Sequence, residues 1–137
     1  MFFKKNNNNE NNESLIRISA LLIHAAKIDE SYTQHEEDII KKTLLELGAN
    51  DKNIDDIIKN GKKKESSSNQ ILEFTREIKA IKNEEKIKII ESLWKIIYSN
   101  KEADIYETNL MRRLAGLLYI DSKTMGDIKS KIKIKFL

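Results

Sequence analysis

The chain contains no cysteine, no proline and only four glycines. The lack of cysteine excludes disulfides, thiolate metal sites and a cysteine nucleophile. The lack of proline, with so few glycines, favours helices that are joined by short polar turns. No apolar run approaches the ~20 residues that a transmembrane helix needs. We therefore expect a small helical protein of the cytoplasm, either free or peripheral at the inner face of the membrane.

Uncompensated charge and catalytic motifs are also scarce. Lys and Arg number 25 and Asp and Glu number 22, which leaves a net charge of only +3. The lysine run 62–64 is followed by Glu65, and no series of stacking aromatic residues accompanies it. Nucleic acid is therefore not an expected partner. A glycine-rich phosphate loop and a serine paired with a base are both missing, so we expect no enzymatic activity.

Apolar residues recur at spacings of three and four residues along most of the chain, which predicts amphipathic helices. The expected helices cover 14–28, 39–47, 54–60, 71–81, 87–97, 110–118 and roughly 122–133. Gly48 and Gly61 are the expected stops of the second and third helices, and 62–69 is an expected polar connector. The predicted fold class is all-α, a compact bundle of about seven helices over residues 14–137.

Both ends of the chain are unusual. Residues 1–13 include an Asn-rich stretch and predict a flexible leader, in which Phe2 and Phe3 either insert into a membrane surface or partner groove or are simply disordered. The segment 131–136 alternates lysine with apolar residues, which is typical of a strand. Without another strand to pair with, it is interpreted as a frayed helix end or a docked extension. Its lysines make it either a weak electrostatic contact or a solvated tail.

The chain resembles itself at an offset of 71 residues. Ile18 then aligns with Ile89, Leu22 with Leu93, and Leu47 with Leu118. Helices one to three would thus repeat as helices five to seven, with the fourth helix as a bridge between two three-helix units.

The turns inside the two units match as well. Each has oxygen-bearing side chains at positions i, i+4 and i+7, which are Asp29, Thr33 and Glu36 in the first turn and Asn100, Asp104 and Glu107 in the second. In one interpretation, Thr33 and Asp104 are helix N-caps, and Glu36 and Glu107 complete capping boxes. Each cap would contribute ~1 kcal/mol to stability.

In the other interpretation, acidic residues of both turns bind one divalent cation. Hard oxygen ligands favour Ca²⁺ or Mg²⁺ over Zn²⁺. His35 lies inside the first turn and is either an additional ligand, which would suit zinc, or an exposed first-turn residue. The two interpretations do not exclude one another, but the capping interpretation requires less.

Several segments resemble the TerB tellurite-resistance family, which shares its fold with the N-terminal domain of DjlA-type co-chaperones. The similarity covers roughly 14–130 and includes the two turns, Leu72–Arg76, Glu91–Trp94 and Leu110–Ala115. It implies a seven-helix bundle and a metal site of Asp29, Glu36, Asp104 and Glu107, with Asn100 and His35 nearby. The Asp-Gly of the family pattern is Asp29-Glu30 in the first turn and Asn100-Lys101 in the second.

The expected function follows from these features. The resemblance implies a non-catalytic stress-response or interaction module that binds a protein partner, tuned by a divalent cation at the acidic turns. The alternative is an adaptor at the membrane surface, which would use the N-terminal Phe/Lys segment and the basic C-terminal tail. The oligomeric state cannot be derived from these residues.

Overall fold

The computed structural model describes residues 2–27, 33–67, 75, 78, 81–99 and 105–135, without the side chains of 2–11, 99 and 105–108. The described helices are α1 (Phe2–Ala26), α2 (Gln34–Glu46), α3 (Ile54–Ser66), α5 (Asn83–Ser99), α6 (Ile105–Leu117) and α7 (Ser122–Lys135). No strand occurs in this part of the chain, so the all-α prediction is confirmed. The helix expected over 71–81 lies almost wholly outside the described residues, and the count of seven stays a prediction.

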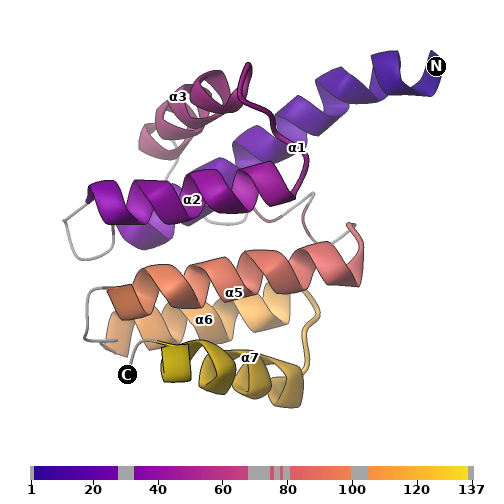
Figure 1. Ribbon diagram of the computed structural model, residues 1–137. Helices are drawn as coiled ribbons and strands as arrows, with labels where there is room; N and C mark the ends of the chain where they lie inside the picture. The colour runs from indigo at the N-terminus through magenta and orange to yellow at the C-terminus, as the bar shows by residue number, and fades with distance from the viewer. Residues whose placement is uncertain are drawn as a thin grey trace.

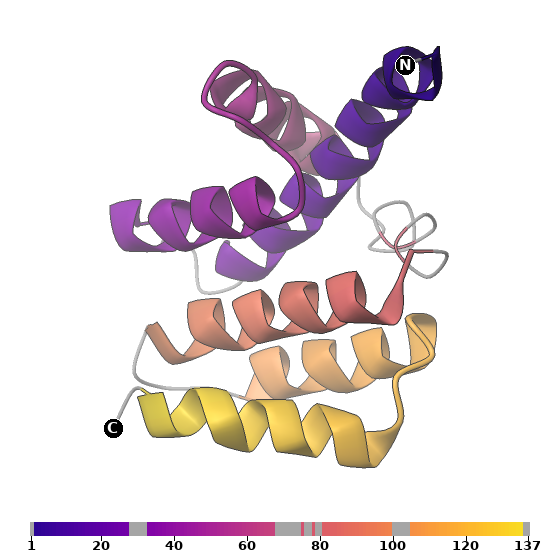
Figure 2. The ribbon, with the colours of Figure 1, turned by 45° about the vertical axis from the view of Figure 1, so that its right-hand side comes forward.

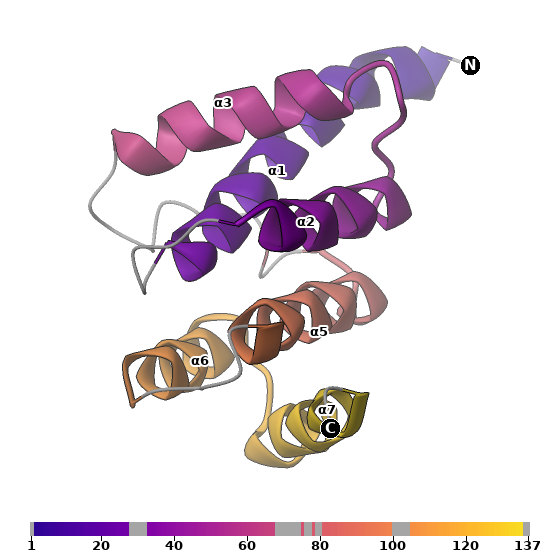
Figure 3. The same ribbon diagram turned by 60° about the vertical axis from the view of Figure 1, so that its left-hand side comes forward.

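The helices form two groups that meet along α2 and α5. In Figures 1 and 2, α1, α2 and α3 lie above, and α5, α6 and α7 lie below. The helix α5 packs against α1, α2 and α7, and α7 lies on the side of α5 away from α2 (Figure 3). No described helix has the length and apolar character needed to cross a membrane.

The core lies where α1, α2 and α5 meet. Its largest fully buried side chains include Leu21, Leu22, Ile23, Ile40, Leu44, Ile89, Ile90, Leu93 and Ile96. Trp94 is buried, stacks on Tyr98 with the ring centroids 5.8 Å apart, and lies under the Lys129 ammonium of α7. The pattern of apolar residues thus joins both groups of helices into one core.

Helix α3 corrects one prediction from sequence. The sequence predicts an end before Gly61, but α3 continues through this residue to Ser66, so the expected connector is helical in its first half. A Cβ atom at Gly61 would come within 2.4 Å of Ser19 Oγ and 2.8 Å of Ser19 Cβ on α1. Gly61 is therefore a site of close packing between α1 and α3 rather than a helix stop.

The first helix also differs from expectation. It begins at Phe2 rather than near residue 14, so the Asn-rich segment continues the helix. Asparagine is a poor helix former, but extending an existing helix costs only a fraction of a kcal/mol per residue. Asn12 contacts α3 through a hydrogen bond to its Oδ1 from Asn53 Nδ2 at 3.4 Å. The division into a leader of residues 1–13 and a domain of residues 14–137 stays a prediction.

The C-terminal helix explains the alternating tail. The helix α7 continues to Lys135, so the helical interpretation is correct through this residue and the strand-like pattern is misleading. Ile132 is fully buried, whereas Ile134 is 67% exposed. On a helix, residues two apart lie on different faces, and only one of these isoleucines can reach the core.

Two helices end in the same hydrogen-bond motif. After α2, Ala49 N donates to Leu44 O at 2.9 Å. The residue just before Ala49 is Gly48, which has φ 122°. After α6, Ile120 N donates to Ala115 O at 2.9 Å around Tyr119, with φ 56°. Both are Schellman-type ends, which need a positive φ at this position. The expected stop at Gly48 is confirmed.

Candidate functional site

The first helix–helix turn ends in a capping box. Glu36 N donates to Thr33 Oγ1 at 3.2 Å, and Thr33 N donates to Glu36 Oε1 at 2.8 Å. The Thr33 hydroxyl also donates to Glu36 Oε1 at 3.1 Å. The capping interpretation is thus confirmed for this turn. Glu36 is fully buried, whereas Thr33 is exposed, so the box holds a carboxylate inside the protein at the start of α2.

Most of the predicted metal ligands fall outside the described part of the chain. Asp29, Asn100 and Asp104 lie outside the described residues, and Glu107 lies in α6 with its side chain outside the description. His35 is exposed at the start of α2. Among the described side chains, no three His, Cys, Asp or Glu residues lie together as a metal site would require. The second capping box and the metal site stay predictions.

The arrangement of helices brings the start of α2 and the end of α5 close to one another in the molecule. The helices α2 and α5 lie side by side and run in opposite directions, so the start of α2 and the end of α5 lie at the same end (Figure 1). Between these helices, the hydroxyls of Thr43 and Ser92 form a buried hydrogen bond. This buried polar contact favours one register of α2 on α5.

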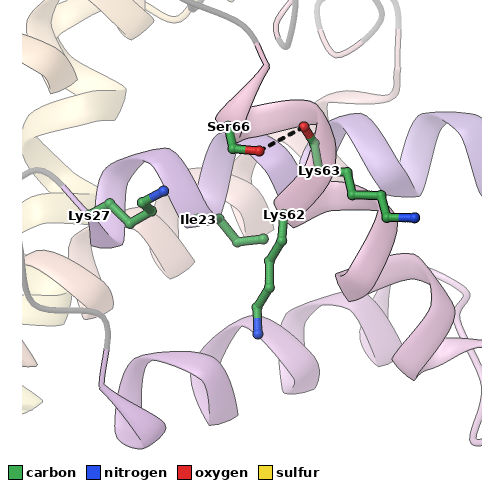
Figure 4. A pocket seen from close by; sticks show the side chains of 5 residues that line it. All are labelled: Ile23, Lys27, Lys62, Lys63 and Ser66. Carbon is green, nitrogen blue, oxygen red and sulfur yellow. Dashed lines mark hydrogen bonds between the residues drawn. The ribbon is translucent and has the colours of Figure 1, made fainter.

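A cavity of about 400 Å³ lies beside α1 and α3 and is lined by Ile23, Lys27, Lys62, Lys63 and Ser66 (Figure 4). Ser66 Oγ donates to the carbonyl oxygen of Lys63 at 3.0 Å. The apolar surface comes from Ile23, and the lysines surround it. This cavity is not predicted from the sequence, because residues 62–69 have the composition of a polar connector.

Acidic residues compensate two of the cavity lysines. Lys27 Nζ lies 2.7 Å from Glu65 Oε1, and Lys62 Nζ lies 2.8 Å from Glu37 Oε1 of α2. Glu65 is nearly buried, and its other oxygen lies 3.3 Å from His24 Nδ1. A carboxylate in such surroundings is retained where cations satisfy it. These ion pairs join α3 to α1 and α2, which is a structural role for the lysines.

A second cavity, of about 300 Å³, lies between α2, α5 and α7. Its charged lining residues are Lys42, Glu46, Lys95 and Lys135. Sequence reasoning missed it too, because the three lysines come from segments far apart in the chain. Only the packing of α7 along α5 brings Lys135 toward α2.

Comparison with known proteins identifies the family. No curated protein and no solved structure matches the chain at a significant level. The family model described as "Tellurite resistance protein TerB" matches residues 15–130, which is most of the chain. This range runs from α1 into α7 and includes both helix–helix turns. The chain therefore belongs to the TerB tellurite-resistance family.

Proposed function

We propose that the protein is a non-catalytic TerB module of the stress response that binds a divalent cation between its two acidic turns. The cation would hold the end of the α1–α2 pair against the end of the α5–α6 pair. By binding only the folded arrangement, it would stabilise the helical surface that a protein partner recognises. Ca²⁺ or Mg²⁺ suits the oxygen ligands better than Zn²⁺.

The observation that carries this proposal is the burial of Glu36 at the turn. Thr33 supplies two hydrogen bonds to one carboxylate oxygen of Glu36, which hold this carboxylate in place at the start of α2. A buried negative charge is stabilised by a nearby cation. The antiparallel contact of α2 and α5 and the matched Schellman ends support a repeated unit that brings two such turns together.

The test separates the cap from the metal ligand. Glu36→Gln keeps an acceptor oxygen for the capping box but removes the charge that a hard cation needs. Amide-resolved NMR titration of the full chain with Ca²⁺, Mg²⁺ and Zn²⁺ should shift residues of both turns, and Glu36→Gln should abolish these shifts. Glu84→Gln, at the exposed start of α5, is the matched control and should bind as the wild type does. Silence at both turns in the wild type would refute the proposal.

A second candidate function is attachment to an anionic membrane surface. The observation in its favour is Ile134, which is 67% exposed between Lys133 and Lys135 on α7. On a helix that lies in a membrane interface, an apolar side chain inserts between the headgroups while neighbouring lysines contact anionic lipids. Co-sedimentation with phosphatidylserine vesicles should be weakened by Ile134→Ser, while the exposed substitution Lys59→Ser serves as control. Absence of wild-type binding at low salt would exclude this function.

A further inference from the structure

Three lysines from three different helices line one small cavity. Lys42 comes from α2, Lys95 from α5 and Lys135 from the last turn of α7, and the cavity volume is about 300 Å³. Lys42 and Lys135 are exposed, and Lys95 is half-buried. Long lysine side chains from separate helices can thus direct their ammonium groups to one ligand without a rearrangement of the backbone.

The rest of the lining comes from α2. Ile39 and Thr43 contribute to the wall, and Glu46 is the single acidic residue. The Thr43 hydroxyl is already engaged, because it donates to the carbonyl oxygen of Ile39 at 2.9 Å. The cavity therefore combines a largely apolar wall with cationic side chains, an arrangement that suits a small anion with an organic group attached.

The three cavity lysines have no acidic partner among the described residues. Four other lysines form ion pairs, which are Lys27 with Glu65, Lys41 with Asp55, Lys62 with Glu37, and Lys131 with Glu91. Within the described residues, Lys42, Lys95 and Lys135 form no ion pair. Three ammonium groups against the one carboxylate of Glu46 leave a local charge of 3 − 1 = +2.

This charge favours a dianion. Lysine binds phosphate as a point charge, so three lysines around one cavity match the two negative charges of a phosphate ester. The C-terminal end of α7 opposes an anion through its dipole, and Lys135 offsets part of that effect. Because the lysines are largely solvated, we expect millimolar affinity that weakens as salt is added.

We propose that the cavity between α2, α5 and α7 binds a phosphate-type dianion. The source is either a small phosphorylated molecule in solution or the phosphorylated headgroup of a membrane lipid. The cavity volume lies at the lower end of known ligand sites, which fits a phosphate group with a small organic substituent. This site is independent of the cation proposed for the acidic turns, and either can fail without the other.

Two probes distinguish the two sources. Glycerol 3-phosphate, a small phosphate monoester, is titrated into the labelled full chain at low salt, and amide shifts are followed at Lys42, Thr43, Lys95 and Lys135. Phosphatidylcholine vesicles that contain a phosphorylated inositol lipid are tested by co-sedimentation, with phosphatidylserine vesicles of equal charge as reference. Preference for glycerol 3-phosphate indicates a soluble ligand, and preference for the inositol lipid indicates a headgroup.

Two double variants test whether the probes bind in this cavity. Lys42→Gln with Lys95→Gln should weaken whichever probe binds by roughly tenfold, since each removes one nearby charge. Lys52→Gln with Lys59→Gln removes the same charge from exposed positions outside the cavity and should leave binding within about twofold. The proposal is overturned if neither probe binds, or if both double variants weaken binding equally. Unchanged amide spectra without ligand verify that the variants fold.

Discussion

Replacement of Gly61 by alanine tests the close approach of α1 and α3. In an open helix position this change stabilises a protein by up to ~1 kcal/mol. At Gly61, however, the new Cβ would lie 2.4 Å from Ser19 Oγ and 2.8 Å from Ser19 Cβ. Ordinary carbon contacts are about 3.5–4.0 Å, so the two helices must move apart. Such overpacking costs typically ~1–3 kcal/mol, and it should outweigh the gain in helix propensity.

Gly126 provides the matched control for this experiment. It also lies inside a helix, α7, and a Cβ there would meet nothing within 4 Å. Urea denaturation followed by circular dichroism should show a lower free energy of unfolding for Gly61→Ala and a higher one for Gly126→Ala. Because the propensity term is common to both, their difference measures the steric cost, about 1–3 kcal/mol.

Combining Gly61→Ala with a substitution of Ser19 tests whether these two residues are in close contact. Ser19→Gly removes both atoms that the new Cβ would meet most closely, so Gly61→Ala should be better tolerated in that background. The two changes should be non-additive by more than ~0.5 kcal/mol, the usual limit for independent sites. Equal effects of Gly61→Ala and Gly126→Ala on stability would show that α1 and α3 do not pack closely here.

Two further predictions concern helix ends. Tyr119 has φ 56° and is 78% exposed, so Tyr119→Gly should raise the free energy of unfolding by about 0.5–1 kcal/mol, whereas Gly48→Ala, at φ 122°, should lower it in the same urea assay. Asp121 precedes α7, and hydrogen bonds from Thr124 hold the pKa of its carboxyl below the ordinary value of 3.8. A lowered folded-state pKa stabilises the protein above the unfolded-state pKa, so the wild type should exceed Asp121→Asn in stability at neutral pH. That difference should disappear as the pH falls through the folded-state pKa; a constant difference down to that pH would contradict this role.

Local patterns were sufficient for most of the helices and for one cap. The spacing of apolar residues predicts α2, α5 and α6, since a helix must bury one face whatever it packs against. Thr33 and Glu36 form the expected capping box because the motif depends only on residues three apart in the same turn. The predicted metal site cannot be derived from one local motif in this way, because it needs side chains from two turns that are 71 residues apart.

Contacts between helices determine the features of this protein that the local sequence pattern does not predict. The sequence determined an all-helical chain, the Gly48 stop and the capping box, because these follow from backbone preferences of neighbouring residues. The sequence predicts that Gly61 ends a helix, but this residue lies inside α3 and packs closely against Ser19 on α1. Likewise, only the placement of α7 brings Lys135 to the cavity of Lys42 and Lys95. Such contacts join residues far apart in the chain, and their free energy exists only once the helices have packed together.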